Sequence, residues 1–250
     1  MNGLESHADG AALTARGPLV PLRLPTGDNG VRLLERILSR IVNAVSGSDR
    51  LRIARVETQE ELERLGVARV AMYQQRHNYL ASLFDHQGVD EMDARSFVFA
   101  GYIGDTIVAS VRLSVPPFEA AECVGMDRLT SFLGAGSHDR YLEMSRLVVD
   151  EHCSIRSTSR ALLIYAGLLT YFSTSYEHYL GIVRPKVKAS FKFRLERDVL
   201  AFNIPQRGNH EYHLVKGTFA ADCQEILGHH IDVVKSVLND GGGSDGTPFL

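Results

Sequence analysis

The chain has 250 residues, of which 44% are hydrophobic and 23% are charged, and its formal net charge is −3. This balance is typical of a globular protein with a real core, and it argues against a polycation that coats nucleic acid. Cys123, Cys153 and Cys223 are widely spaced and include no CxxC pair, which argues against a zinc knuckle or a disulfide framework. With no run of 18 apolar residues and no secretory signal pattern, we expect a cytoplasmic protein without a membrane span.

The N-terminal part is predicted to contain a flexible leader and one helix. Residues 1–30 are rich in Gly, Ala and Pro and show no periodicity, which is typical of a flexible segment. Over residues 31–48 apolar residues recur at helical spacing, and Gly47 closes the pattern. We expect the apolar face of this amphipathic helix to dock on the main domain. Binding a partner and touching a membrane are the alternatives.

The main domain is expected to run from residue 51 to residue 230. A first strand is followed by a helix that begins with a capping box of Thr58 and Glu61. The elements expected after it are a hairpin around Gly104-Asp105, a loop region with Pro116-Pro117, strand 141–150, helix 156–175, strand 178–184, helix 185–198 and strands 200–204 and 210–217. Residues 231–250 are interpreted as the end of a C-terminal helix and a flexible tail. This order predicts an α/β protein with a mixed sheet.

Three fragments carry charges that a folded chain has to pair. They are Asp90 and Asp93 in a loop before the hairpin, Arg112 at the end of its second strand, and Glu143, Ser145 and Arg146 within strand 141–150. Charges in a strand that continues as Leu-Val-Val are costly to bury without partners, so we expect ion pairs among these fragments. Strand alternation places Glu143 and Ser145 on one face, and Met144 and Arg146 on the other.

These fragments, in this order of elements, resemble the acyl-homoserine-lactone (autoinducer) synthases. They are still more similar to the N-acyl amino acid synthases of the GNAT superfamily, over residues 51–216. The resemblance implies a three-layer α/β/α GNAT fold. It also implies an N-acyltransferase that moves a medium- or long-chain acyl group from a phosphopantetheine thioester to an amine. Arg76 and Phe132 match two further positions of that group. The chain has no Trp, which argues against the homoserine-lactone product.

The transfer needs a neutral amine, a polarised carbonyl and a proton for the leaving thiolate. Glu143 is the candidate base, directly or through a water, beside Ser145 and Arg146, because a partly buried carboxylate can have a raised pKa. The resemblance implies that the backbone of the splayed strand after Arg146 polarises the carbonyl. The residues expected there are Leu147, Val148 and Val149. The residues expected to order the acceptor pocket are Arg76, Asp90, Asp93, Arg112 and Phe132.

The donor is expected to be an acyl carrier protein, with CoA as the alternative. The glycine-rich pyrophosphate loop of CoA-using GNAT enzymes is missing, and in its place stand Arg156, Ser157, Thr158, Ser159 and Arg160. Helix N-terminal amides can still hold a pantetheine arm there. A basic cluster follows, which would steer an acidic carrier protein. Its members are Arg184, Lys186, Lys188, Lys192 and Arg194.

Plainer interpretations of the same residues stay open. Glu143 and Arg146 can form a structural ion pair only, Asp90 and Asp93 can be solvated loop acids, and the basic helix and Arg76 can be ordinary helix surface. The alternative functions are an acetyl-CoA-dependent N-acetyltransferase and a non-catalytic GNAT-like module that binds a carrier protein or a peptide. The acceptor is expected to be an amino acid or a peptide side chain. Neither a metal nor a permanently bound cofactor is expected.

Overall fold

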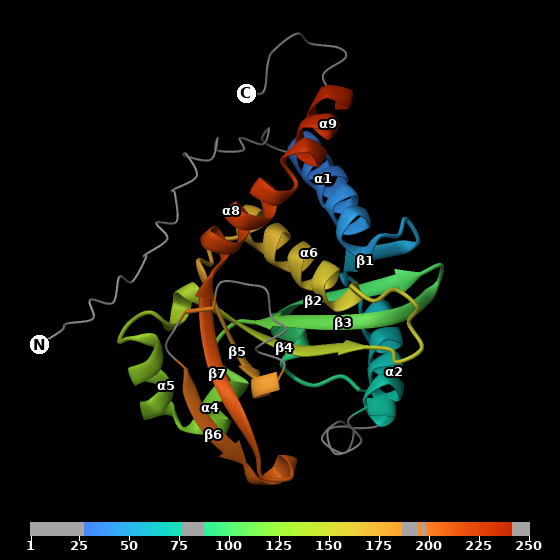
Figure 1. Cartoon of the computed structure of the whole chain (residues 1–250). Helices are drawn as coiled ribbons and strands as arrows, with labels where there is room; N and C mark the ends of the chain where they lie inside the picture. The colour runs from blue at the N-terminus through green and yellow to red at the C-terminus, as the bar shows by residue number, and fades with distance from the viewer. Residues whose placement is uncertain (1–27, 77–87, 187–194, 197–198, 242–250) are drawn as a thin grey trace, which may run out of the picture.

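A single mixed sheet organises the described part of the chain, which in this computed structural model comprises residues 28–76, 88–186, 195–196 and 199–241. Seven strands of that part run in the order β1-β2-β3-β4-β5-β7-β6 (Figure 1). Their bounds are β1 (Leu51–Arg55), β2 (Ser96–Ile103), β3 (Thr106–Ser114), β4 (Tyr141–Val149), β5 (His178–Val183), β6 (Leu200–Ile204) and β7 (His210–Thr218). Neighbouring strands pair antiparallel except β4 and β5, which are parallel. The predicted mixed α/β sheet is confirmed.

Helices cover both faces of the sheet, which gives three layers. One face is covered by α1 (Asp28–Ser46), α6 (Thr158–Ser173), α8 (Phe219–His229) and α9 (Ile231–Gly241), which lie above the sheet in Figure 1. The other face is covered by α2 (Gln59–Arg76), α4 (Glu119–Val124) and α5 (Met126–Leu133). The first group of helices shares one large apolar core with the sheet. None of the described helices is long and apolar enough to cross a membrane.

Local signals explain several of the boundaries. The capping box at the start of α2 forms as expected, because the amide of Glu61 donates to Thr58 Oγ1 at 3.1 Å and the amide of Thr58 donates to Glu61 Oε2 at 3.1 Å. The β2–β3 hairpin turns at Gly104, whose φ of 59° is left-handed and favours glycine.

The helices α1 and α9 belong to the same packed body as the predicted domain of residues 51–230. The apolar face of α1 is buried at Leu34, Ile37 and Ile41, and it packs against α6 and α9. Residues 231–241 form a helix of their own rather than the end of one. Within the described residues, the apolar face of α1 therefore docks on the main domain. The expected leader up to residue 27 and the tail from residue 242 lie outside the described residues.

A loop region was expected after Pro116-Pro117, and the structure has α4 and α5 there instead. Both helices are short, and they end at Gly125 (φ 85°) and Gly134 (φ 92°). A six-residue helix is too short to show a clear period in sequence, and an isolated helix of this length is marginal in water. The N-terminus of α4 is instead held by Glu143, which lies more than 20 residues later. The predicted helix over 185–198 lies mostly outside the described residues. Pro185 and Lys186 are helical, but Leu195 and Glu196 are not, and the amide of Glu196 donates to the carbonyl of Lys216 at 2.9 Å, so the predicted helix does not extend over these two residues.

Candidate active site

The sheet splits between its two parallel strands. Pairing between β4 and β5 covers only Tyr141–Met144 on β4 and His178–Gly181 on β5. Beyond these residues β4 continues beside β3, and β5 continues beside β7. A gap therefore opens in the middle of the sheet, immediately after Met144. Gly181 allows the last close approach, since a Cβ there would lie 3.2 Å from the carbonyl oxygen of Met144.

A β-bulge lies next to this gap. Arg112 of β3 faces Ser145, but Ser110 faces Val148, so β4 contains one extra residue between these pairs. Arg146 takes the strain of the bulge with a φ of 53°, in the left-handed region that few non-glycine residues adopt. The predicted alternation was therefore wrong at this residue. The extra residue turns Arg146 to the same face as Ser145, while Met144 stays on the opposite face, as expected.

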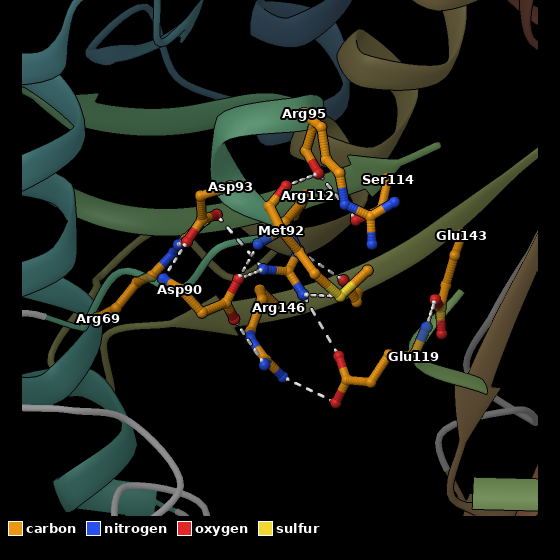
Figure 2. A network of polar contacts seen from close by, with 12 residues as sticks. Arg69, Asp90, Met92, Asp93, Arg95, Arg112, Ser114, Glu119, Glu143 and Arg146 are labelled. Carbon is orange, nitrogen blue, oxygen red and sulfur yellow. Dashed lines mark hydrogen bonds and ion pairs between the residues drawn. The ribbon is translucent and has the colours of Figure 1, made fainter. Parts of the chain in front are cut away.

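The predicted partners Asp90, Arg112 and Arg146 come together at the bulge (Figure 2). Arg112 is fully buried, donates to Asp90 Oδ1, and donates through Nε to Ser145 Oγ at 3.0 Å. Arg146 donates to Asp90 Oδ2 at 2.9 Å. Burial would raise the pKa of Asp90, but the guanidinium groups of Arg112 and Arg146 hold it below its ordinary value. Asp90 is thus an ionised acid clamped between two arginines.

A second buried pair fixes the loop that carries Asp90. Asp93 accepts two hydrogen bonds from Arg69 Nη1, at 2.8 and 2.9 Å, and one from the amide of Asp90 at 3.0 Å. Arg69 also donates to Ser110 Oγ at 2.9 Å. The side chains of Arg69 and Asp93 have no exposed area. Asp93 therefore positions Asp90 rather than facing solvent.

Arg69 was not identified from the sequence, although a signal was present. It lies four residues after Leu65 and three before Met72, which are both buried, so an arginine occupies the apolar stripe of α2. Such a placement calls for a buried partner. Arg76, which was predicted instead, is the last residue of α2.

Glu119, at the start of α4, accepts hydrogen bonds from three arginines of the site. Its Oε1 accepts from Arg146 at 3.2 Å and from Arg207 at 2.9 Å, and its Oε2 accepts from Arg112 at 3.3 Å. Arg207 comes from the turn between β6 and β7, 88 residues away along the chain. No short-range pattern marks Glu119 or Arg207, because each of their partners belongs to a different element of the fold. We call the following set the charged cluster: Arg69, Asp90, Asp93, Arg112, Glu119, Arg146 and Arg207.

Glu143 borders the charged cluster but has different partners (Figure 2). It is 2% exposed, and its two oxygens accept from the backbone amides of Glu119 at 2.6 Å and Ala120 at 2.9 Å. Burial, together with the negative charge of Glu119, raises the pKa of Glu143 to about 8. Glu143 therefore anchors α4, and through it Glu119, and it is a carboxylate that can exchange a proton near neutral pH.

The other predicted residues lie around the gap or outside the described chain. Leu147, Val148 and Val149 continue β4 past the bulge. Residues 156–160 lead into α6, where Thr158 is buried and Arg156 and Arg160 are exposed. Phe132 lies on α5, where its side chain packs against the apolar cluster under α4 and α5 and its carbonyl accepts from Lys216 at 2.9 Å. Of the predicted basic cluster, Arg184 and Lys186 are described, whereas Lys188, Lys192 and Arg194 lie outside the described residues.

The described residues hold no group of three or more His, Cys, Asp or Glu side chains that could hold a metal ion. The arginines occupy the charged cluster instead, and each of its carboxylates is hydrogen-bonded to an arginine. What this arrangement offers is a set of fixed charges on one side of an open strand edge. That combination suits binding and polarising a substrate that carries both charge and a carbonyl.

No family model matches the sequence, and no curated protein matches it either. Solved structures do match. FeeM, an N-acyl amino acid synthase from uncultured soil microbes, superposes with a TM-score of 0.51 at 12% identity, over 68% of this chain and 92% of that one. The CoA-dependent acyl-homoserine lactone synthase BjaI gives a TM-score of 0.52 at 15% identity, over 72% and 92%.

TofI, solved with an inhibitor and MTA, gives a TM-score of 0.53 at 15% identity, over 72% of this chain and 96% of that one. The chain has the fold of these synthases. The predicted GNAT fold is confirmed, and so is the structural resemblance to N-acyl amino acid and acyl-homoserine-lactone synthases. At these identities the likeness concerns the fold, and function has to be argued from the site.

Proposed function

We propose that this protein is an N-acyltransferase that moves an acyl group from a phosphopantetheine thioester to an amine. The observation that carries the proposal is the coincidence of three features in one place: the gap between β4 and β5, the bulge at Arg146, and a buried carboxylate, Glu143, whose pKa is raised to about 8. The fold shared with N-acyl amino acid and acyl-homoserine lactone synthases supports it as analogy.

The donor thioester is proposed to lie in the gap, with its carbonyl against the free edge of β4. Beyond Met144 that edge is no longer paired with β5, so the backbone amides of this stretch that point away from β3, such as that of Val149, can donate to the carbonyl oxygen. The pantetheine arm would then run toward the start of α6. Arg156 and Arg160 are exposed there and suit the phosphate of the arm.

The chemical step is attack of a neutral amine on the thioester carbonyl carbon. The new C–N bond forms, and a proton of the nitrogen passes to Glu143 through a water. The C–S bond then breaks, and the thiolate takes that proton from the protonated Glu143 and leaves as the thiol. A base with a pKa of about 8 matches this task, because an α-amino group has a pKa of about 8. Asp90 and Glu119 are already bonded to arginines, so their role in this scheme is to fix the guanidinium groups of Arg112 and Arg146 beside the gap.

The proposed donor is a medium- or long-chain acyl group on an acyl carrier protein, and the proposed acceptor is an amino acid or a peptide amine. Arg184 and Lys186, at the end of β5, are the described part of the basic surface that would attract an acidic carrier. BjaI is described as CoA-dependent, so CoA thioesters are the donor to compare.

The test is mass spectrometry of small molecules that copurify from cells expressing the chain, followed by assays with acyl carrier protein and CoA thioesters. We expect an N-acylated amine with the wild type and with Glu122→Gln, an exposed glutamate on the same helix α4. We expect its loss in Glu143→Gln. Absence of any acylated amine from the wild type with both donors, over a full set of amino acids and a lysine peptide, would overturn the proposal.

A further inference from the structure

The outward face of α1 carries three arginines in a row. The apolar face of this helix is buried in the core that it shares with α6 and α9, so solvent reaches only the opposite face. Arg32, Arg36 and Arg40 are all exposed, and their spacing of four residues places them on one side of the helix. They extend over about 12 Å along its axis. We call these three residues the arginine stripe.

The arginine stripe lies in an open groove beside α9, which packs against α1 at the top of Figure 1. Ser39 and Asn43 of α1 also line the groove, so its polar residues are mostly hydrogen-bond donors. Within the described part of the chain, the stripe side chains form no ion pair and no hydrogen bond. Glu35 is the one acid among the described residues that line the groove, so three arginines and one glutamate leave a local charge of +2.

Neither helix stability nor internal pairing explains this arrangement. Like charges four residues apart destabilise a helix, and the stripe contains two such pairs. A solvated helix face more often alternates the sign of its charges. The whole chain has a net charge of −3, so the stripe is a local excess of positive charge on an acidic protein. Guanidinium groups bind phosphate with two parallel hydrogen bonds each, so the stripe suits a surface that carries several phosphates.

The shape and composition of the groove favour lipid headgroups over a macromolecule. Protein partners are held mainly by aromatic and apolar anchors in pockets, and the described residues of the groove include no aromatic side chain. Headgroups move independently in the bilayer, so they can take up the positions of three guanidinium groups without a preformed pocket. The proposed product adds a reason, because an amine with a medium or long acyl chain partitions into a bilayer.

We propose that the arginine stripe docks this protein on the surface of a bilayer that contains anionic phospholipids, with α1 lying along the membrane plane. The choice of a bilayer rests on the proposed function, but the stripe itself takes no part in acyl transfer. The charged cluster lies under α2 and α4, on the other side of the sheet from α1 (Figure 1). Docking through α1 therefore leaves the candidate active site open to solution.

A pair of charge-matched variants tests the proposal. The stripe variant replaces all three arginines by glutamine, which also favours the helix, so its Tm should not fall. The control variant replaces three exposed arginines of other elements by glutamine: Arg64, Arg128 and Arg140. Each variant loses three positive charges, so the formal net charge falls from −3 to −6 in both.

The measurement is flotation with vesicles of phosphatidylcholine alone or with roughly 30% phosphatidylglycerol, an anionic lipid. We expect the wild type and the control variant to float only with the anionic vesicles, and added salt to release them. An arginine near an anionic surface changes the partition coefficient about fivefold, so the stripe variant should bind about 100-fold more weakly. Acyl transfer between soluble substrates, without vesicles, should be the same in all three proteins.

The outcomes separate docking from catalysis. Flotation that depends on the stripe, in a protein that acylates no amine, would keep the docking assignment and contradict the proposed function. The assignment is wrong if the wild type does not float, if it floats equally with uncharged vesicles, or if both variants lose binding equally, because net charge alone would then decide. It is also wrong if a poly-glutamate peptide or single-stranded DNA, at the same concentration of charge, competes the vesicles off the stripe, since the surface would then belong to a macromolecule.

Discussion

The two faces of the sheet are built from different kinds of contact. The face under α2 and α4 buries Arg69, Asp93, Arg112 and Glu143. The face under α1, α6 and α8 buries mostly hydrocarbon, such as Leu162 and Ile37, and Asp222 is its one buried charged residue among those that the structure describes. Apolar burial stabilises the fold directly, at about 25 cal/mol per Å². Buried ion pairs gain little, because desolvation offsets their attraction. We infer that the buried ion pairs are kept for the geometry that they impose at the bulge, and that the stability comes from apolar burial, most of it under α1 and α6.

The largest effect is expected from removing the main partner of a buried charge. In Arg69→Met, Asp93 loses both of its hydrogen bonds to the guanidinium of Arg69 and keeps only the longer ion pair with Arg112, at 3.5 Å, and the amide of Asp90. The free energy of unfolding should fall by about 3 kcal/mol. Urea denaturation followed by circular dichroism measures this change.

The double variant Arg69→Met/Asp93→Leu tests whether the buried ion pair itself stabilises the fold. With both charges removed, most of the lost stability should return, because replacing a buried pair by apolar groups is often neutral or stabilising. Function should not return, since Asp93 also holds the amide of Asp90. A double variant as unstable as Arg69→Met would mean that the pair itself stabilises the fold, and that the two faces do not differ in the way we infer.

The next largest effect is expected at the bulge, where one substitution separates the role of the Arg146 backbone from the role of its charge. Arg146→Gly keeps the left-handed backbone, which glycine adopts without strain, and removes the guanidinium. We expect kcat/KM for acyl transfer to fall by about 100-fold, as for loss of one preorganised charge or donor, with little change in Tm. Asn209→Gly is the matched control, because Asn209 also has a φ of 53° but is exposed in the β6–β7 turn. Equal activity losses in the two variants would point to the backbone rather than to the charge.

How much of the fold and of the site could be predicted from the sequence depended on how far apart along the chain the contacting residues lie. The strands, the α2 capping box and the pairing of Asp90 with Arg112 and Arg146 follow from local patterns and from the cost of burying charge. The face of Arg146 could not be read, because one inserted residue reverses the alternation of a strand.

The place of Glu119 in the site could not be predicted from the sequence either. Its helix, α4, is held by a carboxylate from a later strand, and its ion-pair partners come from three other elements. Arg69 is the intermediate case. Its place in the apolar stripe of α2 marked it as buried, but only the fold shows that Asp93 is the partner. Local patterns thus predicted the strands and the longer helices but not α4 and α5, and the assembly of the site depended on contacts between different elements.

A smaller effect is expected in the pH dependence of stability. The pKa of Glu143 rises from an ordinary 4.5 to about 8 in the folded protein, so the folded state binds more protons than the unfolded state between these values. The contribution of Glu143 to stability is therefore complete below pH 4.5 and is lost as the pH rises through 8. Its slope cannot exceed about 1.4 kcal/mol per pH unit, the value for one proton.

Denaturation of the wild type and of Glu143→Gln at pH 5, 6.5 and 8 measures this slope, because the other titrating groups cancel in the difference. The wild type should lose stability relative to the variant as the pH rises. Parallel curves would mean that Glu143 is already ionised at pH 5, stabilised by the two amides of α4, and would remove the argument for Glu143 as a base near neutral pH.

The smallest effect is expected at an ion pair outside both buried faces. Arg140 and Glu177 pair across the start of β4 and β5, with side chains 55% and 53% exposed. Because water screens the two charges and both side chains lose freedom on pairing, Arg140→Ala should change the free energy of unfolding by less than about 1 kcal/mol. The same denaturation assay as for Arg69→Met gives the direct comparison, at 0.05 M and 0.5 M salt, concentrations chosen to span roughly a threefold change in screening length. A loss as large as that of Arg69→Met would show that burial is not what separates the charged cluster from an ordinary surface pair, and the contrast between the two faces would then need another cause.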